Sequence, residues 1–168
     1  GAGAALIKNP ALAKEIIYAT IKGGGGLPVS VKTRLGFDPS LLQTPISALI
    51  LHLRTSSEMS KVPAHWEEIS KAVDIRNKLK LKTLIIGNGD VKTLKEAKIK
   101  CKKYKIDGVM IGRGIFENVY LFNEKIDIKN VTPKHKISLL LKHLRLFKKT
   151  WGDTKHFELM KKFVKCYV

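Results

Sequence analysis

The chain has 168 residues, of which 44% are hydrophobic, so it can bury one core, and we expect one domain with a small appendage. Its 32 basic and 14 acidic residues give a net charge of +18, which favours polyanionic partners such as nucleic acid. Cys101 and Cys166 show no zinc-site or disulfide spacing, which fits a reducing cytoplasm. No apolar run reaches the roughly 18 residues of a membrane span, and no signal-peptide pattern is present, so we expect a cytoplasmic protein without a membrane or metal partner.

The first predicted element is a helix that begins after Asn9. Asn9 can cap it, Pro10 is well tolerated at the first helical position, and the glycines at 23–26 end it. A strand is predicted at 27–36, where β-branched residues lie between glycines, and a second, apolar strand is predicted at 47–55. Only twelve residues separate Arg34 from Ser47, close to the minimum for a crossover between parallel strands.

Helices and strands alternate further along the chain. Trp66, Ile69 and Val73 recur at helical spacing, and a third strand is predicted at 82–90. Thr93 and Glu96 form the capping box of another helix, and the fourth strand is predicted at 109–112. Such alternation indicates βαβ units with a parallel sheet, so the fold class is α/β.

The pattern changes after Phe122. A helix is predicted from Thr132 and Pro133, a second follows Trp151-Gly152, and no further strand appears. We therefore predict an α/β domain at 1–124 and the start of an all-α domain at 132–168. The second segment carries ten basic and two acidic residues, a net charge of +8, so we expect it to contact phosphates in a salt-dependent way. Solvated lysines on helix faces are the alternative interpretation.

Each predicted strand ends on polar or flexible residues, which in parallel α/β folds meet at the ligand-binding edge of the sheet. Gly112-Arg113-Gly114 is suited to hold a phosphate, or is an ordinary tight turn. Lys32 suits an anionic ligand or a salt bridge, and His52 suits a ligand or a hydrogen-bonded core position. Asn88-Gly89-Asp90 suits a heterocycle or is plain turn chemistry. Together these residues predict one binding site.

With these residues in view, the sequence resembles the tRNA-dihydrouridine synthase family, flavoenzymes that reduce particular uridines in tRNA. The matching segments occur in family order: "GAGAALIKNP", "LPVSVKTRLGFD", "LHLRTSSEMSKVPAHWE", "LIIGNGDV", "DGVMIGRGIFENVYLF" and "FELMKKFVKCY". The resemblance implies a partial TIM (β/α)₈ barrel, about its last four strands, followed by the start of a helical tRNA-binding domain. It also implies FMN as cofactor and NADPH as reductant.

Specific residues take expected roles from that resemblance. Lys32 and His52 would contact FMN, Asn88-Gly89-Asp90 would line its pocket, and Gly112 with Arg113 would hold its phosphate. The family's catalytic cysteine lies upstream of the "GAGAAL" element, and Cys101 and Cys166 do not match it, so the proton donor is assigned to no residue. We therefore expect an N-terminally truncated member in which the helix between the first two strands is eroded.

Three functions follow as hypotheses. The first is a tRNA-dihydrouridine synthase fragment that contributes the cofactor pocket. The second is a barrel enzyme for phosphorylated sugars, an aldolase or isomerase, in which Lys32 forms a Schiff base. The third is a catalytically inactive remnant that binds RNA by charge. In each case a half barrel would leave two open sheet edges, so we expect a marginally folded or oligomeric chain, with aggregation as a further outcome.

Overall fold

The structure is a computed structural model that describes residues 3–167. These residues form two compact units, one ending at Gly112 and the other beginning at Arg113. The predicted division into domains at 1–124 and 132–168 stays a prediction. Within the described residues, no helix is both long and apolar enough to cross a membrane.

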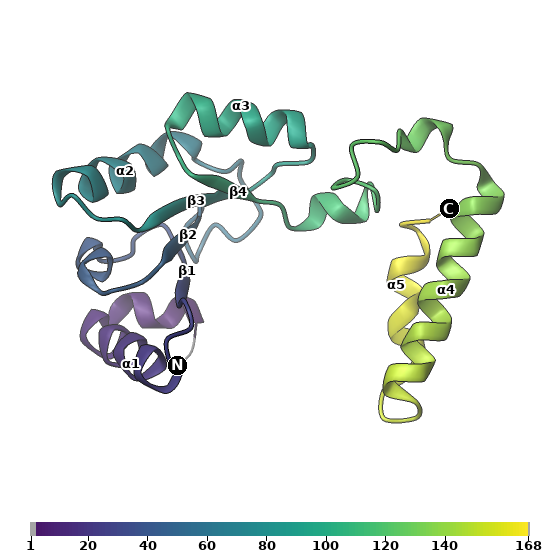
Figure 1. Ribbon diagram of the computed structural model, residues 1–168, viewed down its shortest axis with the longest axis horizontal. Helices are drawn as coiled ribbons and strands as arrows, with labels where there is room; N and C mark the ends of the chain where they lie inside the picture. Colours follow the sequence, from purple (N-terminus) through teal and green to yellow (C-terminus); the bar gives the residue numbers. More distant parts are fainter. Residues whose placement is uncertain (1–2, 168) are drawn as a thin grey trace. The chain divides into compact units, whose positions relative to one another are not determined.

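The first unit contains one sheet of four parallel strands in the order β1-β2-β3-β4 (Figure 1). The strands are β1 (Ser30–Arg34), β2 (Ala48–His52), β3 (Leu84–Asn88) and β4 (Gly108–Met110). This confirms the α/β class with a parallel sheet, as in part of a TIM barrel. The predicted fourth strand at 109–112 is displaced: β4 ends at Met110, because β3 ends at its register partner Asn88 and offers Ile111 no ladder partner.

Three helices belong to this unit, and their ends follow the sequence signals. They are α1 (Pro10–Gly23), α2 (Ile69–Lys78) and α3 (Leu94–Tyr104), with short 3₁₀ helices η1 (Gly3–Lys8) and η3 (Trp66–Glu68). The Asn9 side chain accepts a hydrogen bond from Leu12 N at 3.1 Å. Thr93 accepts one from Glu96 N at 3.0 Å, as the capping box predicted. The caps confirm the predicted starts of α1 and α3.

The crossover from β1 to β2 contains no α-helix, as its length predicted. A single 3₁₀ turn, η2 (Pro39–Gln43), replaces it, and Asp38 caps this turn by accepting a hydrogen bond from Ser40 N. Leu41, Leu42 and Ile46 of this connection are buried in the core. The short connection therefore still covers the sheet, because its leucines fill the space that a helix would occupy.

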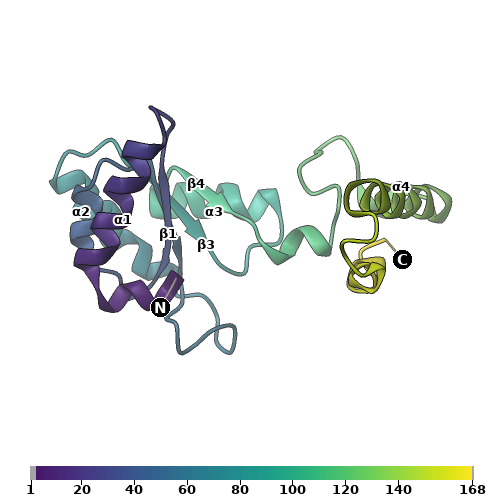
Figure 2. The ribbon, with the colours of Figure 1, turned by 90° about the horizontal axis from the view of Figure 1, so that it is seen from below.

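The two faces of the sheet differ. Leu49, Leu51 and Ile85 belong to a core cluster that α1 and α2 also enter, through Ala13, Ile17, Ala72 and Val73. Figure 2 shows α1 and α2 on the same side of β1. The alternate residues of the strands lie on the opposite face, where Leu84 and Met110 are exposed. The helices thus cover one face, and the other carries the strand-end side chains.

The second unit is helical. Its elements are η4 (Arg113–Phe116), η5 (Ile128–Asn130), α4 (Pro133–Trp151), η6 (Phe157–Met160) and α5 (Lys161–Val164). Helix α4 begins where predicted, with Thr132 accepting a hydrogen bond from His135 N at 3.3 Å. The last predicted helix is instead divided between η6 and α5. Because His156 provides no side-chain cap, its first turn tightens to 3₁₀ geometry.

Candidate functional site

The ends of β1, β2 and β3 bring the predicted side chains onto one face of the sheet. Arg34 is the register partner of His52, and His52 is the partner of Asn88. Lys32 lies two residues before Arg34, so it shares their face. The structure therefore brings together Lys32, His52 and Asn88, as predicted, with Arg34, the other polar residue at the end of β1, beside them.

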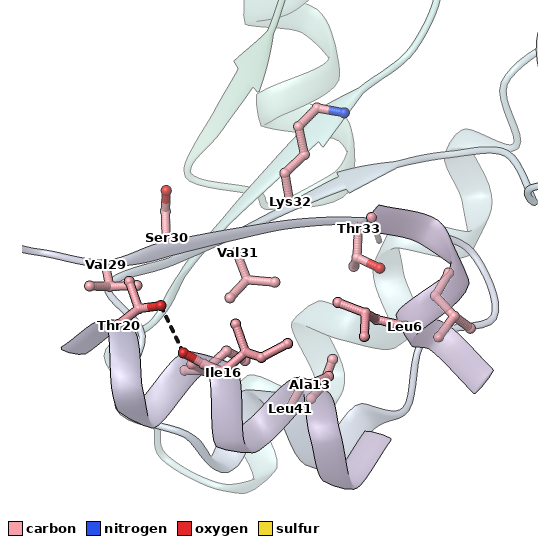
Figure 3. A pocket seen from close by; sticks show the side chains of 13 residues that line it. Leu6, Ala13, Ile16, Thr20, Val29, Ser30, Val31, Lys32, Thr33 and Leu41 are labelled. Carbon is pink, nitrogen blue, oxygen red and sulfur yellow. Dashed lines mark hydrogen bonds between the residues drawn. The ribbon is translucent and has the colours of Figure 1, made fainter. Parts of the chain in front are cut away.

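An apolar pocket lies on the side of β1 opposite to the ammonium group of Lys32. This pocket has a volume of about 250 Å³ and is lined by Leu6, Ile16 and Val31 among others. Figure 3 shows Val31 directed toward the pocket, whereas the ammonium group of Lys32 is directed away from it, although Lys32 also borders the space. The apolar pocket is thus distinct from the polar site.

Lys32 has an exposed side chain whose pKa is lowered, first by partial burial and then by the charge of Arg34. In the described part of the chain no carboxylate forms an ion pair with Lys32. The structural salt bridge that the sequence left open for Lys32 is therefore absent there. An ammonium beside a guanidinium favours an anionic or electron-rich ligand.

His52 is neutral at pH 7. Partial burial lowers its pKa to about 4, and the charges of Arg34, Lys32 and Arg54 act in the same direction. Arg54 Nη1 lies 3.4 Å from His52 Nε2. Because a guanidinium only donates, this contact requires Nε2 to accept, which leaves the proton on Nδ1. His52 can therefore donate one hydrogen bond from Nδ1 to a ligand.

An ion pair between a buried arginine and a partly exposed aspartate fixes the geometry behind these side chains. Arg54 is 3% exposed; its Nη2 donates to Asp90 Oδ2, and its Nε donates to Val62 O at 2.6 Å. Asp90 Oδ2 also accepts from Ala64 N at 2.8 Å. The predicted place of Asp90 in the pocket lining stays a prediction; its carboxylate joins the end of β2 to the turn after β3 and to the 62–64 segment.

The turn after β3 is held by Trp66, a role that the sequence analysis missed. Trp66 Nε1 donates to Gly89 O at 3.0 Å. A Cβ on Gly87 would lie 2.5 Å from the Trp66 ring, and one on Gly89, whose φ is +142°, would lie 2.6 Å from Ala64 Cβ. Asn88 Nδ2 donates to Met110 O at 2.8 Å, so its Oδ1 is the atom that could accept from a ligand. The spacing of Trp66 predicted only its helix.

The predicted phosphate-binding turn lies at a boundary in the fold. Gly112 ends the first unit and Arg113 opens the second, in the four-residue 3₁₀ turn η4. Arg113 lines a pocket of about 610 Å³ within the second unit, together with Lys162 and Lys165. Arg113 is thus a pocket residue, and the strand pattern could not predict Lys162 and Lys165 as its neighbours.

The sheet-edge site suits organic ligand binding. In residues 3–167 no group of three or more His, Cys, Asp or Glu side chains could hold a metal ion. Ile50 and Ile86 give the same sheet face an apolar floor between Lys32 and Asn88. A floor of this kind with cations and a neutral donor at its rim can hold a flat, electron-rich heterocycle.

Comparisons with known proteins give consistent similarities. A family model described as "Dihydrouridine synthase (Dus)" matches residues 1–168. A "Probable tRNA-dihydrouridine synthase" of Staphylococcus aureus (strain Mu50) is 43% identical over 178 residues, covering 100% of this chain and 53% of the relative. A "Probable tRNA-dihydrouridine synthase 2" of Bacillus subtilis (strain 168) is 38% identical, covering 100% of this chain and 54% of the relative. The chain therefore spans about half the length of the curated relatives it matches.

Proposed function

Because this chain belongs to the dihydrouridine synthase family, we propose that it is part of a flavin-dependent oxidoreductase that reduces uridine in tRNA to 5,6-dihydrouridine. The observation that carries the proposal is the set of Lys32, His52 and Asn88 on one sheet face beside an apolar floor. Relatives with the printed name "Probable tRNA-dihydrouridine synthase" support tRNA as the substrate. We propose the cytoplasm as its location.

The residues present fit FMN as the cofactor. An isoalloxazine ring is flat and apolar along one side and carries carbonyl oxygens and ring nitrogens on the other. Ile50 and Ile86 are the apolar residues of this face, and Ile86 is partly exposed. Lys32 supplies a cationic donor and His52 a neutral one, and both can reach only the same side of the sheet.

Lys32, His52 and Asn88 would each make a different contact with the cofactor. Lys32 would place positive charge near the oxygen atoms of the ring, where electron density increases on reduction. Neutral His52 would donate a hydrogen bond without adding charge, and Asn88 would accept one through Oδ1. The chemistry supplied by the cofactor is hydride transfer to the uracil ring after reduction by NADPH.

Two further assignments belong to this proposal. Gly112 and Arg113 would hold the phosphate of FMN, since a Cβ at Gly112 would meet no atom within 4 Å and the backbone there leaves room for a ligand. Gly89 and Asp90 would line the pocket, with Asp90 acting through Arg54. We assign the role of proton donor to neither Cys101 nor Cys166.

Titration of the chain with FMN, followed by flavin fluorescence, tests the cofactor assignment. We expect saturable binding that Lys32→Ala and His52→Ala each weaken about tenfold, the effect of losing one charge-assisted hydrogen bond or its equivalent. Lys78→Ala, an exposed lysine at the end of α2, is the matched control and should leave binding unchanged. Binding that all three variants affect equally would contradict this site.

Two further experiments address the other hypotheses. Borohydride trapping of a sugar-phosphate carbonyl on Lys32 would favour an aldolase instead. A folded chain that binds RNA and no FMN would favour the inactive RNA-binding remnant, for which the net charge of +8 in 132–168 is the supporting observation.

A further inference from the structure

The second unit contains a pocket of about 610 Å³ whose lining the proposed function leaves largely unused. It lies between η4 and the segment around α5, and its lining includes Arg113, Phe116, Glu117, Lys162, Phe163 and Lys165. Its volume is in the range of small-ligand sites. All of these residues belong to one compact unit, so the pocket is complete within it.

The pocket presents an aromatic surface. The rings of Phe116 and Phe163 are 5.7 Å apart, centroid to centroid, and tilted by 53°. Phe163 also contacts His143 of α4, with ring centroids 5.9 Å apart, so its position is fixed by packing. Phe116 remains 48% exposed. An exposed ring supported from behind in a pocket is a stacking surface for a flat heterocycle.

The charges beside the rings favour a phosphate. Three basic residues line the pocket against one acidic residue, Glu117. Lys162 Nζ lies 4.9 Å from the centroid of the Phe163 ring, so a cation stands directly beside the aromatic surface. A phosphate near Lys162 and Lys165 and a heterocycle on Phe116 together define a nucleotide.

We propose that this pocket binds one nucleotide of a single-stranded RNA segment, with its base on Phe116 and its phosphate at Lys162 and Lys165. RNA fits better than a free nucleotide because the segment 132–168 has a net charge of +8, which only a strand with several phosphates can use. A single-stranded segment is required because bases in a duplex are stacked on both sides. The choice of RNA rests on the proposed function.

Fluorescence anisotropy with a labelled single-stranded oligoribonucleotide of about ten nucleotides tests the proposal. We expect Phe116→Leu to weaken binding at least about fivefold through lost base stacking. Phe122→Leu is the matched control, because Phe122 is 66% exposed and lies outside the pocket lining. Equal effects of the two variants would overturn the assignment to this pocket.

A second pair of variants examines the phosphate-binding lysines independently. Lys162→Gln with Lys165→Gln should reduce the slope of log affinity against log salt by about 0.7 for each phosphate that is no longer neutralised. Lys142→Gln with Lys149→Gln removes the same charge from exposed positions of α4 outside the pocket. Equal slopes for both double variants would mean diffuse charge attraction and would overturn the proposal.

Competition experiments decide whether the pocket binds a nucleotide within RNA or a free nucleotide. Unlabelled single-stranded RNA should displace the probe, whereas uridine monophosphate at the same concentration should not. Displacement by uridine monophosphate as efficiently as by RNA would overturn the RNA assignment. Failure of FMN to bind at Lys32 and His52, by contrast, would contradict the proposed cofactor site and leave the result for Phe116 standing, since the variants share no residue.

Discussion

Substitution of Asp90 by Asn should destabilise the first unit by about 2–3 kcal/mol, because removal of one partner of a buried ion pair typically costs about 3–5 kcal/mol. Arg54 is 3% exposed and would keep its charge without a counter-charge, whereas the Asp90 side chain is 39% exposed, so water reduces the cost. The backbone contributes little: Asp90 has φ +55°, which Asn tolerates, and the Asn oxygen can still accept from Ala64 N.

Urea unfolding at pH 7 measures this free energy. A Trp151→Phe background leaves Trp66, which is buried in the first unit, as the fluorescent reporter. Glu68→Gln is the control, because its ion pair with Lys71 is exposed and should contribute about 0.5 kcal/mol or less. A loss for Asp90→Asn no larger than that of the control would refute the view that the Arg54–Asp90 pair holds the strand ends together.

Three other outcomes are expected. Gly87→Ala should cost about 1–3 kcal/mol of unfolding free energy, because its Cβ would lie 2.5 Å from the Trp66 ring, whereas Gly23→Ala meets nothing within 4 Å; equal urea midpoints would contradict this. The pKa of His52 is about 4 in the folded chain and 6.5 ordinarily, so the unfolded chain binds the proton first as the pH falls. The contribution of His52 to the free energy of unfolding is therefore complete above pH 6.5 and is lost between pH 6.5 and 4. This loss should be absent from the pH dependence of His52→Asn. RNA binding should weaken steeply with salt because 132–168 has a net charge of +8, and affinity that is equal at low and high salt would count against phosphate contacts.

The sequence predicted those features of the fold that depend on local signals. Asn9 and Thr93 cap their helices as their residue types suggest, and the alternation of apolar runs with amphipathic segments predicted the parallel sheet. Because parallel strands share a direction, the polar ends marked by Lys32, His52 and Asn88 had to meet at one edge. The register between β1, β2 and β3 confirms that they do.

Contacts between distant segments could not be read from local patterns. Arg54 and Asp90 are separated by 36 residues, and the pair forms only because β2 and β3 are neighbours in register. The hydrogen bond from Trp66 to Gly89 O likewise depends on the packing of η3 against the end of β3. The position of Arg113 in a pocket with Lys162 depends on the fold of the second unit, which no strand motif encodes.

Mapping bound FMN by backbone amide NMR shifts tests the central claim most directly. The account predicts that saturating FMN shifts the amides at the strand ends, around Lys32, His52 and Asn88, and that Lys32→Ala reduces these shifts. Shifts confined to the apolar pocket around Ile16, or to residues of the second unit, would contradict the claim that the open face of the sheet holds the cofactor.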